Sequence, residues 1–134
     1  MDEEALAKQV VDAAYRIHKA VGPGLLESVY ESLLAYELEK RCLSFTRQQP
    51  VPLAYEGVLI ATAFRADLIV EDKLIVEVKS IETIAPVHKK QLLSYLRLSG
   101  KRLGLLINFN SALIKDGITR MANNLPEPPW RSSS

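Results

Sequence analysis

The chain has 134 residues, of which 48% are hydrophobic and 25% are charged, and its formal net charge is +1. This length suits one domain that buries its own core, which we expect to span residues 1–125. The Pro- and Ser-rich residues 126–134 are predicted to form a flexible tail. The near-neutral charge excludes a global attraction to nucleic acid, so any such partner would have to be held by a local basic patch. The single cysteine, Cys42, excludes an internal disulfide.

The sequence gives no sign of a membrane partner. No apolar run approaches the roughly 18 residues that a membrane span requires. The first residues, Met1-Asp2-Glu3-Glu4, are acidic, whereas a secretory signal starts with basic residues followed by an apolar stretch. We therefore expect a cytoplasmic protein.

Hydrophobic periodicity predicts the following elements in chain order. They are helices at 4–20 and 25–41, strands at 45–55, 58–70 and 74–80, a helix at 86–99 and a strand at 103–109. Pro50 and Pro52 cannot donate ladder hydrogen bonds, so the first strand should lie at a sheet edge. Asp116-Gly117 is typical of a tight hairpin turn. The order α-α-β-β-β-α-β indicates an α/β layer fold around a mixed sheet.

The second and third predicted strands form a hairpin whose register can be counted. If the loop is residues 71–73, Val70 pairs with Leu74, and Asp67 lies opposite Glu77. One face of the hairpin then carries only apolar residues: Phe64, Ala66, Leu68, Val70, Leu74, Val76 and Val78. The other face carries Arg65, Asp67, Ile69, Ile75, Glu77 and Lys79. The first face needs no functional explanation, whereas the second places two carboxylates side by side.

The paired carboxylates suggest a metal site. Opposite residues in such a hairpin have Cβ atoms roughly 4.5–5.5 Å apart, so unshielded Asp67 and Glu77 would repel each other. A hard divalent cation removes this repulsion, and one or two carboxylates are the usual protein ligands of Mg²⁺, so we expect Mg²⁺ or Mn²⁺. Lys79 points to the same side, where its ammonium can orient an attacking water or stabilise developing negative charge.

Other interpretations of the hairpin stay open from the sequence. Charged residues on a hairpin face are often a solvated surface with weak ion pairs. Arg65 could neutralise Asp67 without any metal. A two-residue turn would place Asp67 and Glu77 on opposite sides of the sheet. Each of these alternatives would weaken the metal-site hypothesis.

Several motifs together resemble a known family. They are Gly24-x-x-Glu27-x-x-Tyr30, Arg65-Ala66-Asp67, Ile75-Val76-Glu77-Val78-Lys79, Gln91-Leu92-Leu93-Ser94-Tyr95-Leu96 and Gly104-Leu105-Leu106-Ile107-Asn108-Phe109. The combination resembles the GxxExxY family from about residue 5 to about residue 123. That family is similar to a branch of the PD-(D/E)XK nuclease superfamily, and its Gln-x-x-x-Tyr helix is similar to that of RecB-like and Cas4-like nucleases. The resemblance implies a restriction-endonuclease-like fold.

The resemblance also implies roles for individual residues. Asp67 and Glu77 would bind the metal, joined by Glu27 from the second helix and by the backbone carbonyl of Val78. Lys79 would be catalytic. Gln91 and Tyr95 share one helical face and would position Lys79, the water or a substrate phosphate, although their spacing alone is equally typical of a stripe packed on the sheet.

These inferences predict a metal-dependent nuclease that hydrolyses nucleic-acid phosphodiester bonds, with DNA favoured over RNA. The alternative is a non-catalytic nucleic-acid- or protein-binding module that keeps the nuclease fold. A homodimer or a larger assembly is also compatible with the sequence. Five basic residues are candidates for a phosphate-binding strip or for a solvated helix face: Lys89, Lys90, Arg97, Lys101 and Arg102.

Overall fold

The computed structural model describes residues 1–125, so the flexible tail predicted for 126–134 lies outside the described residues. The elements in chain order are α1 (Glu3–Val21), α2 (Glu27–Lys40), β1 (Phe45–Tyr55), β2 (Val58–Val70), β3 (Leu74–Lys79), α3 (Pro86–Ser99), β4 (Leu103–Asn108), a short 3₁₀ helix (Ile114–Gly117) and β5 (Ile118–Ala122). The predicted α/β class is confirmed, and the predicted boundaries agree to within about two residues.

Local sequence signals begin and end the helices. The Asp2 side chain accepts a 2.8 Å hydrogen bond from the backbone N–H of Ala5 and so caps the N-terminus of α1. Pro86 occupies the first turn of α3, where its missing N–H costs nothing. Gly100 ends α3 with φ +70°, a left-handed conformation that glycine adopts without a steric penalty. These signals could be read in the sequence because they act within a few residues.

The five strands form one mixed sheet in the order β1-β2-β3-β4-β5. β1 lies at an edge, as its prolines predicted. β3 and β4 are parallel and joined through α3, while the other neighbouring pairs are antiparallel. The predicted element order was wrong in omitting β5. Asp116 and Gly117 lie in the 3₁₀ helix that precedes β5 rather than in a tight hairpin turn. β5 was missed because its residues 118–122 show no clear apolar alternation.

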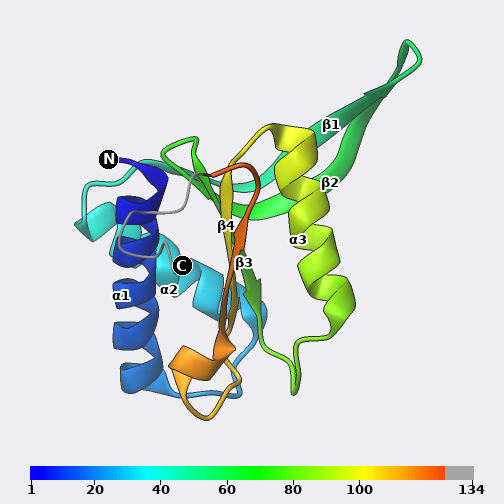
Figure 1. Ribbon diagram of the computed structural model, residues 1–134. Helices are drawn as coiled ribbons and strands as arrows, with labels where there is room; N and C mark the ends of the chain where they lie inside the picture. The colour runs from blue at the N-terminus through cyan, green and yellow to red at the C-terminus, as the bar shows by residue number, and fades with distance from the viewer. Residues whose placement is uncertain (126–134) are drawn as a thin grey trace, which may run out of the picture.

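The sheet is covered on both faces (Figure 1). α1 and α2 pack on one face around the first core, which includes Leu6, Val10, Tyr30, Leu34, Leu68, Val76, Val78 and Phe109. α3 packs on the other face around the second core, which consists of Val51, Phe64, Ala66, Ile69, Ile75, Leu92, Leu96 and Leu106. α3 lies very close to β4, because a Cβ atom at Gly104 would come within 2.8 Å of Leu92 Cδ1. This three-layer arrangement buries the central strands on both sides.

The hairpin register is confirmed, but its division into faces is partly wrong. Val70 pairs with Leu74, as counted from the three-residue loop. Phe64 and Ala66, however, contact α3 in the second core instead of sharing a side with Leu68. The side of the sheet to which the even-numbered residues of β2 point therefore changes at Asp67, from the α3 side before it to the α1 and α2 side after it. Asp67 falls opposite Gln48, a residue of β1 with φ +51° that lies outside the paired register. The local distortion of β1 and β2 explains why simple alternation failed there.

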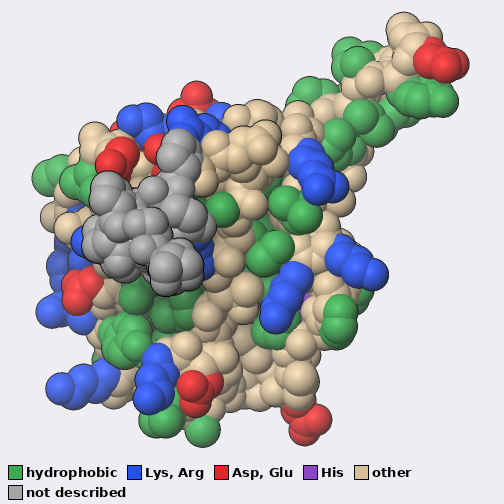
Figure 2. All heavy atoms as spheres, viewed as in Figure 1, with side chains coloured by type: hydrophobic (Ala, Val, Ile, Leu, Met, Phe, Trp, Pro, Cys, Tyr) green, Lys and Arg blue, Asp and Glu red, His purple; other side chains and the backbone are tan. Residues whose placement is uncertain are grey.

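The outer half of the β1–β2 hairpin projects from the body of the protein as an arm (Figure 1). Its apolar side chains are exposed along most of the arm (Figure 2). The exposed large ones are Tyr55, Val58, Leu59 and Ile60. In the described part of the chain, no helix combines the length and apolar character needed to cross a membrane.

Candidate metal site on the β2–β3 hairpin

Asp67 and Glu77 lie side by side where the ladder between β2 and β3 ends. The last paired residues are Leu68 and Val76. Beyond them, the backbone N–H of Asp67 donates to Glu77 Oε2 at 2.8 Å, and the backbone N–H of Val78 donates to Asp67 Oδ2 at 2.8 Å. Each carboxylate thus accepts a hydrogen bond from the opposite strand. The two side chains therefore face the same small space and are held there by the backbone.

Glu77 is a buried carboxyl group, because only 7% of the residue is exposed. Burial and, to a lesser extent, the negative charge of Asp67 raise the pKa of Glu77 to about 8. Glu77 is therefore not part of a solvated hairpin surface. The confirmed register excludes the two-residue turn. Arg65 is exposed, and no ion pair within residues 1–125 joins it to Asp67.

Lys79 and Tyr95 lie in the electrostatic environment of the carboxylates. The positive charge of the half-buried Lys79 acts to lower the pKa of Glu77, although burial outweighs it. The Tyr95 ring stacks on Phe64 with centroids 3.8 Å apart. Burial raises the pKa of Tyr95, and the charges of Glu77 and Asp67 add to this effect. Their roles in the site stay predictions.

Gln91 is less clearly part of the site. It lies one helical turn before Tyr95 on α3, but its side chain is exposed. Within residues 1–125 its amide makes no hydrogen bond. The structure therefore places Gln91 on the helix that covers the site without giving it a contact, and its role stays a prediction.

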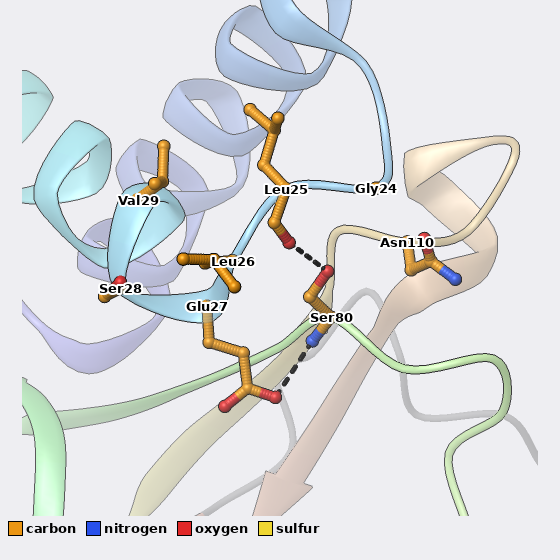
Figure 3. Close-up of a pocket in the computed structure, with 8 residues that line it drawn as sticks. All are labelled: Gly24, Leu25, Leu26, Glu27, Ser28, Val29, Ser80 and Asn110. Carbon is orange, nitrogen blue, oxygen red and sulfur yellow. Dashed lines mark hydrogen bonds between the residues drawn. The ribbon is translucent and has the colours of Figure 1, made fainter.

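Glu27 approaches the end of β3 from the first turn of α2 (Figure 3). Its Oε2 accepts a 3.2 Å hydrogen bond from the backbone N–H of Ser80, the residue after Lys79, and Ser80 Oγ donates to the carbonyl of Leu25 at 2.6 Å. Glu27, Leu25 and Ser80 line an open hollow of about 870 Å³, and neither Asp67 nor Glu77 is among its lining residues.

The predicted ligand set is only partly assembled. No group of three or more His, Cys, Asp or Glu residues able to hold a metal ion occurs among residues 1–125. Glu27 as a third carboxylate ligand therefore stays a prediction, as does the carbonyl of Val78. The structure instead shows the N–H of Val78 directed at Asp67.

The Asp67–Glu77 pair nevertheless suits a divalent cation. The two carboxylates supply hard oxygen donors, and Mg²⁺ commonly takes one or two such ligands while keeping several waters. The raised pKa of Glu77 measures how unfavourable a second negative charge is in this place without a nearby cation. A bound Mg²⁺ or Mn²⁺ would supply that positive charge, so the residues fit the group.

The structure adds two residues that the sequence did not single out. Gln48 Nε2 donates to Asp67 Oδ1 at 3.0 Å and to Glu31 Oε1 at 2.6 Å. Glu31 comes from α2, and Gln48 from the distorted part of β1. Nothing in the local pattern of residues 45–55 distinguishes Gln48 from Gln49, so only the tertiary fold could reveal this contact.

The predicted basic strip is shorter than expected. Lys101 Nζ forms an ion pair with Asp72 at 2.8 Å, and Arg102 lies 3.9 Å from a carboxylate oxygen of Glu3. The remaining members are all exposed on α3: Lys89, Lys90 and Arg97. Basic side chains indeed stand out over α3, on the right of the body in Figure 2.

Comparisons with known proteins identify a superfamily but no individual relative. No curated protein and no solved structure matches the chain. Residues 4–121 match the family described as the PD-(D/E)XK nuclease superfamily. This range runs from the first turn of α1 into β5 and includes all the candidate site residues. Because the match covers most of the chain and the mixed sheet flanked by helices agrees with that fold, the chain belongs to the PD-(D/E)XK nuclease superfamily.

Proposed function

We propose that this protein is a metal-dependent nuclease that hydrolyses phosphodiester bonds of DNA, within the GxxExxY branch that its motifs resemble. The observation that carries the proposal is the contact between Asp67 and the buried Glu77, whose pKa is raised to about 8. A carboxyl group with a strongly raised pKa beside a second carboxylate is typical of functional sites.

The chain's own residues have distinct parts in the proposed reaction. Asp67 and Glu77 provide the anionic oxygens that hold Mg²⁺ or Mn²⁺, with Glu27 and the Val78 carbonyl as further ligands. When bound, the cation would supply an activated water and polarise the scissile phosphate. Lys79 orients the attacking water and stabilises the negative charge that develops on the phosphate.

α3 completes the proposed site. It packs against the second core, and its Tyr95 lies close enough to Glu77 for the charge of Glu77 to raise the pKa of Tyr95. Tyr95 and Gln91 on this helix position Lys79 or a substrate phosphate. The exposed Lys89, Lys90 and Arg97 attract the nucleic-acid backbone.

DNA is the proposed substrate because the Gln91–Tyr95 motif is similar to that of RecB-like and Cas4-like nucleases. A cytoplasmic location is part of the same proposal and rests on the sequence. A homodimer or a larger assembly is part of the proposal, and the mass of the protein in solution with and without substrate tests it.

The decisive experiment compares cleavage of labelled single- and double-stranded DNA and RNA in Mg²⁺, Mn²⁺ or EDTA. The variants are Glu77→Gln and Asp67→Asn, with Glu39→Gln on the exposed face of α2 as the matched control. Calorimetric titration with Mn²⁺ measures metal affinity in the same samples. We expect metal-dependent DNA cleavage by the wild type and the control, and neither cleavage nor metal binding in the two site variants.

Other outcomes are equally informative. Metal binding that depends on both carboxylates without any cleavage would mean that the activity requires a partner. Wild-type protein that neither binds metal nor cleaves would contradict the proposed function and favour a non-catalytic module on the nuclease fold. Unchanged metal affinity in both site variants would remove Asp67 and Glu77 from the metal site.

A further inference from the structure

We propose that Gln48 is a positioning residue that fixes the carboxylate of Asp67 for metal binding and connects it to α2 through Glu31. The inference rests on the proposed function, because it assigns the partner that orients one of its metal ligands. Gln48 lies on β1, in a different element from each of the predicted site residues.

The donors of Gln48 match the acceptors around it. Its side-chain NH₂ group has two hydrogens and lies 3.0 Å from Asp67 Oδ1 and 2.6 Å from Glu31 Oε1. Ionised carboxylates only accept hydrogen bonds, so the nitrogen of the amide, and not its oxygen, must face both. One neutral group thus separates two negative charges and gives each of them a hydrogen bond.

Glu31 is itself firmly held, so it can serve as an anchor. The residue is only 8% exposed. Arg47 Nε donates to Glu31 Oε2 at 3.0 Å, and Arg47 Nη2 donates to Ser32 Oγ at 3.1 Å. The series of hydrogen bonds therefore runs from Arg47 through Glu31 and Gln48 to Asp67. It connects α2 to the metal site without using Glu27.

The backbone at Gln48 is shaped for this contact. Its φ of +51° is in the left-handed region, which is uncommon for a residue other than glycine. The residues on either side keep regular pairing with β2, since Arg47 pairs with Leu68 and Gln49 with Ala66. The unfavourable conformation is thus confined to the residue that contacts Asp67. Such local strain persists where surrounding contacts determine it, and it is concentrated at functional sites.

These hydrogen bonds hold both oxygens of Asp67. Gln48 fixes Oδ1, and the N–H of Val78 fixes Oδ2 at 2.8 Å. Each carboxylate oxygen can accept more than one interaction, so a cation can still be bound. Groups that orient metal ligands typically change metal affinity or activity about 10–100-fold when they are removed. Gln48 supplies this kind of support from outside the ligand set.

The test compares Gln48→Ala and Gln48→Met with Gln49→Ala. Methionine keeps the approximate length of glutamine but has no N–H donor, whereas Gln49 neighbours Gln48 and contacts Thr46 instead of Asp67. Three quantities are measured on the full chain: Mn²⁺ affinity by calorimetry, kcat and KM for DNA cleavage, and hydrogen exchange of the Val78 amide in EDTA. The exchange rate of the Val78 amide reports how firmly its hydrogen bond to the Asp67 carboxylate is held, and it needs neither metal nor substrate.

We expect both Gln48 variants to bind Mn²⁺ about 10–100-fold more weakly, with kcat reduced and KM for DNA nearly unchanged. The Val78 amide should exchange faster in both, while Gln49→Ala should match the wild type in all three measurements. Wild-type Mn²⁺ affinity in both Gln48 variants would overturn the inference and leave the proposed nuclease intact.

The inference can be judged even if the proposed function fails. If the wild type binds no Mn²⁺, the metal site is wrong, but the hydrogen exchange of Val78 still reports whether Gln48 holds Asp67. Faster exchange of the Val78 amide in both Gln48 variants would by itself support the contact through which Gln48 positions Asp67. Exchange equal to that of the wild type would overturn it.

Discussion

The backbone N–H of Asp67 donates a 2.8 Å hydrogen bond to the carboxyl group of Glu77, a side chain on the opposite strand that is almost fully buried. This bond partly offsets the unfavourable charge on Glu77, but burial and the neighbouring Asp67 still raise its pKa to about 8. Without a nearby cation, Glu77 therefore keeps its proton over much of the pH range below 8.

The raised pKa predicts how stability depends on pH in EDTA. The ordinary pKa of Glu77 is 4.5, so between pH 4.5 and 8 the unfolded chain releases a proton that the folded protein retains. The contribution of Glu77 is therefore most favourable below pH 4.5 and is lost as the pH rises to 8. Each pKa unit corresponds to about 1.4 kcal/mol, so a loss on the order of a few kcal/mol is expected.

The variant Glu77→Gln should remove this pH dependence because glutamine has no proton to lose. Urea unfolding at about pH 5 and pH 8 measures the difference between wild type and variant, and the same two histidines are present in both proteins. We expect the variant to gain stability relative to the wild type at the higher pH. A difference that is the same at both pH values would show that Glu77 titrates normally.

Lys79→Ala should separate catalysis from metal binding. Removing the ammonium should lower kcat by about 10²–10⁴-fold, the range typical of a group that assists proton transfer. Mn²⁺ affinity should change little because Lys79 is not a ligand. Steady-state cleavage and calorimetry provide the two measurements, with Lys8→Ala on the exposed face of α1 as the control. Full activity in the Lys79 variant would make it a surface lysine.

The basic residues of α3 should govern the electrostatic part of DNA binding. Replacing Lys89, Lys90 and Arg97 together with alanine should weaken binding at low salt and flatten its salt dependence. For duplex DNA the slope of log K against log salt should become shallower by about 0.9 for each phosphate that is no longer neutralised. Fluorescence anisotropy at several salt concentrations measures this slope, and an unchanged slope would assign these residues to an ordinary solvated face.

Tyr30, the last residue of the Gly24-x-x-Glu27-x-x-Tyr30 motif, should matter for stability rather than for chemistry. Its ring is fully buried and stacks on Phe109 with centroids 4.4 Å apart. Its hydroxyl donates to the carbonyl of Gly22 at 2.6 Å and accepts from the N–H of Leu25 at 3.2 Å. Tyr30→Phe should therefore keep the core packing but loosen the turn that leads into Glu27.

We expect Tyr30→Phe to lower the free energy of unfolding by about 1–3 kcal/mol, since two backbone groups lose their partner. Chemical denaturation measures the loss, and the exposed Tyr36→Phe serves as the control. Equal stability of the two variants would mean that water replaces the hydroxyl at no cost.

The sequence by itself determined the features that depend on neighbouring residues. The extents of the helices, the edge position of β1 and the register of Val70 with Leu74 all follow from local periodicity, prolines and turn length. That register was enough to bring Asp67 and Glu77 together, because a three-residue loop leaves only one pairing in which the apolar side chains next to the loop share a face.

Only the tertiary structure decided the features that depend on distant elements. Burial in the folded protein raises the pKa of Glu77, and no pattern within the hairpin encodes that burial. At the distortion around Gln48, Phe64 and Ala66 come to lie on the α3 side of the sheet. The side-chain amide of Gln48 there donates a hydrogen bond to Asp67. Such effects escape sequence patterns because they arise from packing between segments far apart in the chain, where a single unpaired residue changes which side of a strand faces the core.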